Sequence, residues 1–211
     1  MSTTFHERTT TRLRPMRETD LAQIADIERE SFTSMWPQTA YKRELDNSVA
    51  RYFVIAEPLP DEPEEAASTT MWRQVRRRFA RASAHGAPAE RVLGFVGLWL
   101  LAGEAHIVTF AVRESHRRRG VGERLLIAAF DCAFAHDQQS LTLEVRASND
   151  PARSLYEKYG MTAAGIRKRY YTDNNEDAVI MTSQPLGEPG YRARLEALRD
   201  RHRTLHPGLW V

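Results

Sequence analysis

One stretch in the second half of the chain combines residues suited to binding a phosphate. Residues 108–112, Val-Thr-Phe-Ala-Val, have the composition of a strand; the loop Arg117-Arg-Arg-Gly-Val-Gly122 follows, and an apolar helical pattern begins directly after it. A glycine-bearing loop between a strand and a helix gathers backbone N–H groups at the positive end of the helix dipole. Gly120 and Gly122 also let the backbone approach a phosphate closely. The alternative is a tight strand-to-helix turn in an arginine-rich chain.

Two familiar phosphate motifs do not fit this loop. A Walker loop needs Lys-Ser/Thr after its second glycine, and the dinucleotide fingerprint needs a third glycine, which Gly120-Val-Gly122-Glu-Arg-Leu125 lacks. The loop does resemble the acetyl-CoA pyrophosphate loop of the GNAT (Gcn5-related) N-acetyltransferases, Arg/Gln-x-x-Gly-x-Gly/Ala after a strand, at every position. Further segments resemble the RimI branch of that family: Leu143-Glu-Val-Arg-Ala-Ser-Asn149, Ser154-Leu-Tyr-Glu-Lys-Tyr-Gly160, Arg167-Lys-Arg-Tyr-Tyr171 and Glu176-Asp-Ala-Val-Ile-Met181.

The resemblance covers residues 11–57 weakly and residues 92–186 closely. It implies an enzyme that transfers the acetyl group of acetyl-CoA directly to a protein N-terminal α-amine, the N-terminal alanine of a small-subunit ribosomal protein. Other acceptors stay open: a different protein N-terminus, a lysine or a small amine. A coenzyme A-binding regulatory module without catalysis is the alternative from another class, although a pure binder would need neither Glu144 nor Tyr156.

Acetyl transfer to an amine needs a base for the ammonium proton and an acid for the departing thiolate. Glu144 is the expected base, directly or through a water, because it matches the RimI pattern. From the residues alone, a strand-surface carboxylate paired with Arg146 would be the preferred interpretation, and the resemblance reverses that preference. Tyr156 is expected to donate its phenolic proton to the coenzyme A sulfur, the alternative being a tyrosine that bridges helix and sheet.

The remaining site residues follow from the resemblance. Asn149 is expected to hydrogen-bond the pantetheine or substrate region, or simply to cap a helix. Strand backbone holds pantetheine and the loop holds pyrophosphate, which assigns to cofactor binding Phe110, Ala111, Val112, Arg117, Arg118, Arg119, Gly120, Val121, Gly122 and Glu123. The acceptor groove is expected between Trp36 on one wall and Tyr170 with Tyr171 on the other. Strand alternation places at least one of these two tyrosines outside the core.

No metal is expected. Among the seven histidines only His202 and His206 stand at His-x-x-x-His spacing, a pair that we do not expect to hold a metal, and a single cysteine, Cys132, rules out a zinc-binding cysteine cluster. The lone cysteine also fits a reducing, cytoplasmic compartment. We expect Cys132 to be a small buried residue, so that transfer proceeds without an acyl-enzyme.

The elements that must position these residues are mixed α and β, so we expect an α/β GNAT fold with a mixed central sheet flanked by helices, in one domain over residues 11–186. Strands are expected at 11–16, 52–56, 92–101, 106–112, 141–145, 161–170 and 178–183. Helices are expected after Asp20, at 38–45 and 121–136, and from Pro151 to a stop at Gly160.

Three segments stand apart from this domain. Residues 58–91 are an expected flexible insertion whose part 72–84 reads as a basic amphipathic helix, residues 1–10 are an expected disordered start, and residues 187–211 form a tail. In the tail, Tyr191, Leu195, Leu198, His202 and Leu205 make an apolar stripe that we expect to dock onto the chain's own domain.

Composition limits the remaining possibilities. Thirty basic and twenty-eight acidic residues leave a net charge of +2, which speaks against bulk nucleic-acid binding. At 42% hydrophobic and 27% charged residues the chain is globular, and no stretch is apolar enough for a membrane span. We therefore expect a monomer whose partner is a protein N-terminus, with no membrane and no direct nucleic-acid contact.

Overall fold

A seven-stranded mixed sheet runs through the centre of the molecule in the order β1-β2-β3-β4-β5-β7-β6. The computed structural model describes residues 11–33, 37–59 and 90–210 of the 211. The strands are β1 Arg12–Pro15, β2 Ala50–Pro58, β3 Glu90–Leu101, β4 Glu104–Val112, β5 Ser140–Arg146, β6 Thr162–Tyr171 and β7 Glu176–Thr182. The helices are α1 Leu21–Ser31, α2 Gln38–Leu45, α4 Val121–Ala135, α5 Asp150–Lys158 and α6 Pro189–Leu205, with single-turn helices η1 Glu18–Asp20, η3 Glu114–His116 and η4 Pro207–Leu209. The expected α/β class with a mixed sheet is confirmed.

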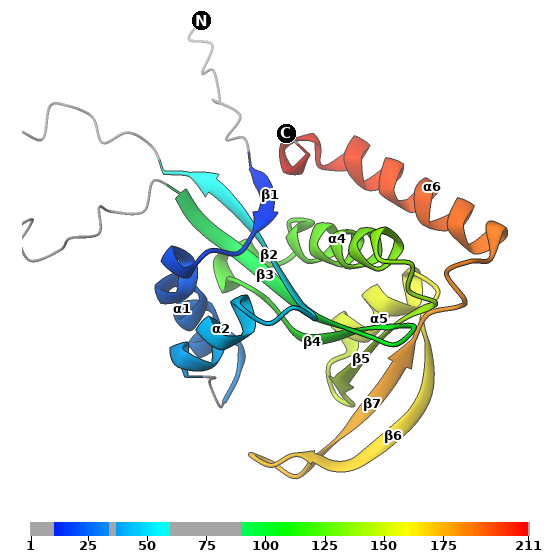
Figure 1. Ribbon diagram of the computed structural model, residues 1–211, viewed down its shortest axis with the longest axis horizontal. Helices are drawn as coiled ribbons and strands as arrows, with labels where there is room; N and C mark the ends of the chain where they lie inside the picture. The colour runs from blue at the N-terminus through cyan, green and yellow to red at the C-terminus, as the bar shows by residue number, and fades with distance from the viewer. Residues whose placement is uncertain (1–10, 34–36, 60–89, 211) are drawn as a thin grey trace, which may run out of the picture.

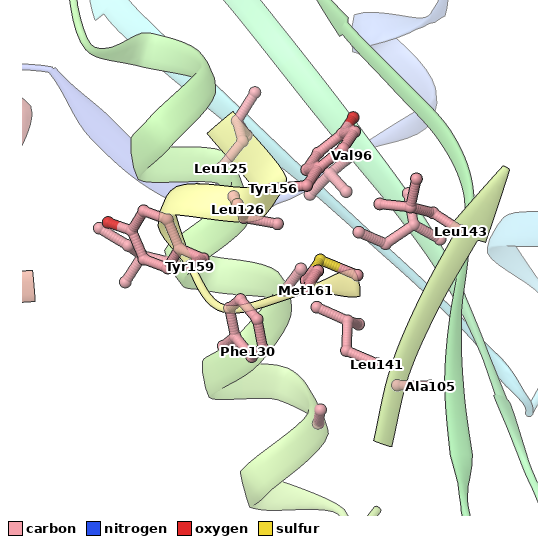
Figure 2. Close-up of a cluster of buried hydrophobic side chains, with 14 of the residues drawn as sticks. Val96, Ala105, Leu125, Leu126, Phe130, Leu141, Leu143, Tyr156, Tyr159 and Met161 are labelled. Carbon is pink, nitrogen blue, oxygen red and sulfur yellow. The ribbon is translucent and has the colours of Figure 1, made fainter. Parts of the chain in front are cut away.

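The helices divide between the two faces of the sheet (Figure 1). α1 and α2 cover one face, and α4 with α6 outside it covers the other. Two apolar clusters correspond to these layers: one gathers Ile24, Ile27 and Tyr41 under α1 and α2, and the other gathers the apolar side of α4 against β3, β4 and β5. Figure 2 shows Leu125, Leu126 and Phe130 of α4 packed with Tyr159 toward Leu141 and Leu143 of β5.

The sheet opens between β4 and β5. These two strands are parallel, whereas every other neighbouring pair is antiparallel. They pair only from Glu104–Ile107 to Ser140–Leu143, although β4 continues to Val112 and β5 to Arg146. A bulge at the same place helps to bend β4, because Gly97 of β3 faces Thr109 while Leu98 faces Ile107. The strands therefore separate just where the sequence places its candidate site.

Most expected elements form where the local pattern indicated. α2 has the expected bounds, and the hairpin between β3 and β4 turns at Gly103, which has a φ of 85°. α5 begins with Pro151 in its first turn, and the side chain of Asn149 accepts a hydrogen bond from Ala152 N–H at 3.2 Å. Gly160 follows the helix with a φ of 79°, a backbone conformation that favours glycine.

The tail docks onto the domain as expected. Tyr191, Leu195 and His202 of α6 are buried, and Tyr191 Oη donates to Tyr159 O at 2.7 Å. At the far end, both Thr11 N–H and its hydroxyl donate to Gly208 O, so the tail also contacts the residue just before β1. Leu205 departs from the expected stripe, because its side chain is 63% exposed.

The expected insertion shares its ends with the sheet. Pro58 ends β2 and Glu90 begins β3, and the two are register partners, as are Glu57 and Arg91. Its interior, including the expected basic helix, lies outside the described residues, as do the expected disordered start at 1–10 and Trp36. Within the described ranges, none of the helices has the combined length and apolar character that crossing a bilayer would require.

Candidate active site

The separation of β4 and β5 creates a cleft of about 290 Å³. Of the expected site residues, six line it: Phe110, Glu144, Asn149, Tyr156, Tyr170 and Tyr171. They come from β4, β5, the start of α5 and the end of β6. Side chains spread over about sixty residues of sequence therefore meet in one place.

Glu144 lies on the wall formed by β5 and its side chain is only 8% exposed. Oε1 is 2.9 Å from Arg167 Nε, on β6, and Oε2 is 3.0 Å from His106 Nε2, on β4. The alternative partner, Arg146, turns instead to Asp173 and Glu176, at 2.9 and 3.2 Å. The carboxylate is thus held at two oxygens by groups from neighbouring strands.

Tyr156 lies on α5, is buried and lines the cleft. Figure 2 shows its ring within the apolar cluster. Its ring meets that of Phe110 edge-on, with centroids 6.3 Å apart. Burial, and to a lesser degree the neighbouring Tyr171, raises the pKa of the Tyr156 phenol above its ordinary value. The hydroxyl therefore stays protonated at neutral pH and is available as a donor.

The loop before α4 turns through two left-handed residues, Arg118 with a φ of 62° and Gly120 with a φ of 84°. Such turns point successive N–H groups to one side, and the first N–H groups of α4 add to them because they have no acceptor within the helix. A side chain at Gly120 would be strained and would also meet the His206 ring, with contacts of 2.8–2.9 Å. The sequence favours glycine at position 120 because it allows a ligand to approach, and the structure adds that only glycine leaves room for the His206 ring.

Two charged side chains of the loop have partners within the protein. Arg117 donates to Val112 O, Glu30 O and Ser31 Oγ at 3.1 Å each, which ties the loop to α1. Glu123 accepts from Lys158 Nζ at 2.5 Å and from Tyr159 Oη at 2.9 Å. Although burial opposes it, these two bonds lower the pKa of Glu123. The backbone N–H groups of the loop, rather than these two side chains, are therefore suited to an anion.

β4 offers a matching surface beyond the point where β5 leaves it. Along Phe110, Ala111 and Val112 the side of β4 that would face β5 has no strand partner. An exposed strand edge presents backbone donors and acceptors to a ligand that carries amides of its own. The unpaired edge and the loop are continuous in sequence, so one ligand with amides and a phosphate fits both.

The opposite wall of the cleft carries the paired tyrosines. The rings of Tyr170 and Tyr171 meet edge-on, with their centroids 5.3 Å apart. Tyr170 is 46% exposed, whereas the Arg146 guanidinium covers the Tyr171 ring, 3.9 Å from its centre. Burial raises the pKa of Tyr171 to about 12. The turn after Tyr171 reaches across to the end of α1, where the Thr33 hydroxyl donates to Asp173 Oδ2 at 2.7 Å. This contact spans the cleft.

Three cleft or near-cleft residues were missed by sequence reasoning. Glu28 and Tyr41 line the cleft, and Tyr41 Oη donates to Glu28 Oε1 at 2.7 Å. A signal existed for Glu28, since it lies one turn after Ile24 on the buried side of α1. His106 carried a weaker one, as a polar residue on the strand that leads to the glycine loop.

No metal site accompanies these groups in the part of the chain that the structure describes, where no three His, Cys, Asp or Glu side chains are placed to share an ion. Cys132 is buried in α4. Burial raises the pKa of its thiol, which disfavours the thiolate that nucleophilic catalysis would need.

Two parallel strands that separate, a glycine loop at the start of a helix, and a carboxylate and a phenol that line one cleft are features of the GNAT class of acyl-transferring enzymes. The acetyltransferase (GNAT) family model matches residues 21–161. This chain belongs to the GNAT family of acetyltransferases.

Within this family, the chain is similar to several N-terminal acetyltransferases. The chain is 35% identical over 170 residues to the putative ribosomal protein bS18-alanine N-acetyltransferase of Bacillus subtilis, covering 80% of this chain and 92% of that one. The crystal structure of the ribosomal-protein-S18-alanine N-acetyltransferase from Escherichia coli matches with a TM-score of 0.62 and 25% identity, over 85% of this chain and 96% of the other. Arabidopsis thaliana NAA60 in complex with acetyl-CoA shares the fold, with a TM-score of 0.64 at 16% identity, over 82% and 97% of the two chains.

Proposed function

We propose that this chain transfers the acetyl group of acetyl-CoA to the N-terminal α-amine of a protein, the alanine at the start of a small-subunit ribosomal protein. The observation that carries the proposal is that Glu144 and Tyr156 line one cleft. Similarity to the Bacillus subtilis and Escherichia coli proteins supports the choice of acceptor.

Acetyl-CoA would supply an activated thioester, and the chain's residues would hold it along β4. The N–H groups of residues 118–123 would bind the pyrophosphate, and the unpaired edge at 110–112 would bond the pantetheine amides. Asn149 both caps α5 and lines the cleft, so its side chain lies within reach of the same region. Preorganised backbone donors of this kind are well suited to polarise a carbonyl.

Glu144 would then take the proton of the acceptor ammonium, and Tyr156 would give its phenolic proton to the departing thiolate. An α-amine has a pKa of about 7.7–8.0, against about 10.4 for a lysine, a difference of roughly 3.5 kcal/mol in the free energy of deprotonation. A carboxylate already engaged by Arg167 is a modest base, which suits an α-amine better than a lysine.

The acceptor would enter beside Tyr170 and Tyr171. Thr33, which lines the same cleft, is held by Asp173 of the turn that follows these tyrosines. Lysine and other N-termini remain as alternatives that the following experiment separates.

The test is incubation of the purified protein with acetyl-CoA and a set of peptides, followed by mass spectrometry to locate any acetyl group. The peptides begin with Ala, Ser or Met, and a matched peptide has a blocked N-terminus and an internal lysine. Acetylation of the Ala- or Ser-starting peptides at the α-amine is the expected result. Modification of lysine alone would contradict the proposal.

A further inference from the structure

A chain of hydrogen-bonding groups leads away from Glu144 along β4 and β5. Glu144 Oε2 lies 3.0 Å from His106 Nε2, and His106 Nδ1 lies 2.8 Å from Thr142 Oγ1. Thr142 in turn donates to Glu104 Oε1 at 2.8 Å. The side chains of Glu144 and His106 are 8% and 20% exposed, Thr142 is buried, and Glu104 at the far end is 42% exposed. The chain therefore runs from the cleft to solvent without a gap.

The register of the two strands produces this line. His106 of β4 is the direct partner of Thr142 of β5, and Glu104 and Glu144 are each two residues away from one of them. Residues two apart on a strand share a face, so all four side chains lie on the same side of the sheet.

The hydrogens of this line can be assigned from the donor capacities. The Thr142 hydroxyl has one hydrogen and gives it to the Glu104 carboxylate, so its oxygen accepts from His106 Nδ1–H. The Nε2 atom of a neutral ring with that tautomer is an acceptor, and it faces a carboxylate, which is also an acceptor. A contact of 3.0 Å between them is therefore the geometry of a hydrogen bond only after a proton has entered the pair, and before that the lone pair of His106 Nε2 is free to receive it.

We propose that His106 is a positioning residue for the transfer reaction: it takes from Glu144 the proton that the acceptor ammonium loses and passes it to solvent through Thr142 and Glu104. The inference rests on the proposed function. The N–H bond of the ammonium breaks as an O–H bond forms at Glu144, and that proton moves to the lone pair of His106 Nε2. The Nδ1 proton then goes to Thr142 as the hydroxyl proton goes to Glu104, and water takes it from there. The ring is left with its hydrogen on Nε2, and exchange with water restores the Nδ1–H tautomer for the next cycle.

Charged neighbours explain why an imidazole suits this step. Arg167 of β6 pairs with Glu144 Oε1, and a proton left on the carboxyl would weaken that ion pair. Imidazoles titrate near pH 6.5 and carboxyls near 4.3, so an imidazole is about two units closer to an α-amine. Further charged groups near the pair are Glu104 of β4, Glu28 of α1 and Arg146 of β5, the last two lining the same cleft as Glu144. Glu44 of α2 accepts from the indole of Trp99, the strand partner of His106.

Steady-state kinetics across pH 6–9.5 tests the relay with an Ala-starting peptide. His106→Gln should lower kcat about 10- to 100-fold near pH 7, and the loss should shrink above pH 8, where the amine is neutral. KM for the peptide should stay unchanged. Thr142→Val should shift the profile in the same direction, and His136→Gln, at the exposed end of α4, is the matched control. A loss equal at every pH, or one in KM alone, would overturn the proposal in favour of a purely structural role.

Nuclear magnetic resonance of the histidine rings tests the shared proton without any acceptor. Glu144→Gln should lower the titration midpoint of His106 by about 1 pH unit and leave that of His136 in place. An unmoved His106 midpoint overturns the relay even if the wild type acetylates peptides. A moved midpoint in a protein that acetylates no α-amine supports the shared proton and refutes the proposed function instead.

Discussion

Glu144 and Tyr156 meet the cleft in different chemical surroundings. The carboxylate is engaged by Arg167 and His106 at its two oxygens, whereas the phenol is buried and contacts the Phe110 ring. Burial keeps the phenol protonated, whereas a cationic guanidinium lies beside the carboxylate. Such a division of roles is typical of a base and an acid in one active site.

Glu144→Gln removes the base and nearly preserves the shape of the side chain. We expect kcat near pH 7 to fall by about 10²-fold, with partial recovery at pH 9 as the acceptor amine loses its own proton. Steady-state rates measured from pH 6 to 9 check this expectation. Glu157→Gln, on the exposed side of α5, is the control and should keep the wild-type rates. An unchanged rate across the range would remove Glu144 from the mechanism.

Tyr156→Phe and Tyr191→Phe form a matched pair of buried tyrosines with opposite expected effects. The first keeps the ring contact with Phe110 and loses the proton donor, so kcat should fall about 10-fold or more while stability changes little. The second loses the bond to Tyr159 O, so the free energy of unfolding should fall by about 1 kcal/mol with kcat retained. Urea titrations and initial rates distinguish them; equal losses of kcat would contradict an acid role for Tyr156.

At this scale, motif residues could be predicted but their partners could not. Glu144 and Tyr156 were identified from short local patterns. The partners of Glu144, however, come from β4 and β6, and no local pattern says that these strands flank β5 at the level of one carboxylate. Arg146, the nearest basic residue on the same strand face, was the natural guess, yet it pairs with Asp173 and Glu176.

Among the elements, the turn between β6 and β7 organises one side of the cleft. Glu176 at the start of β7 accepts from Ser148 N–H at 2.8 Å, and Asp173 bonds both Arg146 and Thr33. The turn therefore joins β5, the start of α5 and the end of α1.

Glu176 gives this turn a measurable pH dependence. Hydrogen bonds from Ser148, and then from Asn174 and Arg146, lower its pKa from 4.5 to about 2. Because the folded value is depressed, the stabilisation is complete above pH 4.5 and is lost as pH falls toward 2. Glu176→Gln should therefore lower the urea midpoint at pH 7 and reduce its decline between pH 4.5 and 2. Glu196→Gln, exposed on α6, is the control and should retain the wild-type decline.

The helices and strands could be predicted from the sequence because the residues that begin and end them are neighbours in sequence. Pro151 and Gly160 define α5, and strict alternation over 141–145 defines β5. The order β5-β7-β6 follows instead from long-range pairing, which alternation cannot reveal. The η4 turn, whose Gly208 bonds Thr11, likewise depends on a partner far away in sequence.

For the molecule as a whole, the tail connects the chain's last described residues to the glycine loop. His202 is buried; its Nε2 donates to Gly120 O at 3.0 Å, and its Nδ1 accepts from the Trp210 indole at 2.9 Å. Trp210 also stacks on the Arg124 guanidinium, 3.9 Å from the ring centre. The loop is thus braced from behind by residues more than eighty positions later.

His202→Phe should loosen this brace. Gly120 O and the indole N–H both lose a partner, so the free energy of unfolding should fall by about 1–3 kcal/mol. Coenzyme A affinity, measured by calorimetry, should also fall, while Arg201→Ala on the exposed side of α6 should change neither. Burial lowers the pKa of His202 below 6.5, so the wild type should lose stability as pH falls through that value, and the variant should lose less.

The junction between Pro58 and Glu90 has a consequence for the history of the chain. Because the two residues are register partners, the intervening segment leaves and rejoins the sheet at one point. A longer loop at this point costs little additional free energy, because the entropic cost of closing a loop rises by only about 0.6 kcal/mol for each doubling of its length. Such a junction lets a lineage lengthen, exchange or lose the intervening segment without disturbing the register of β2 and β3, and it is a natural place to insert a reporter.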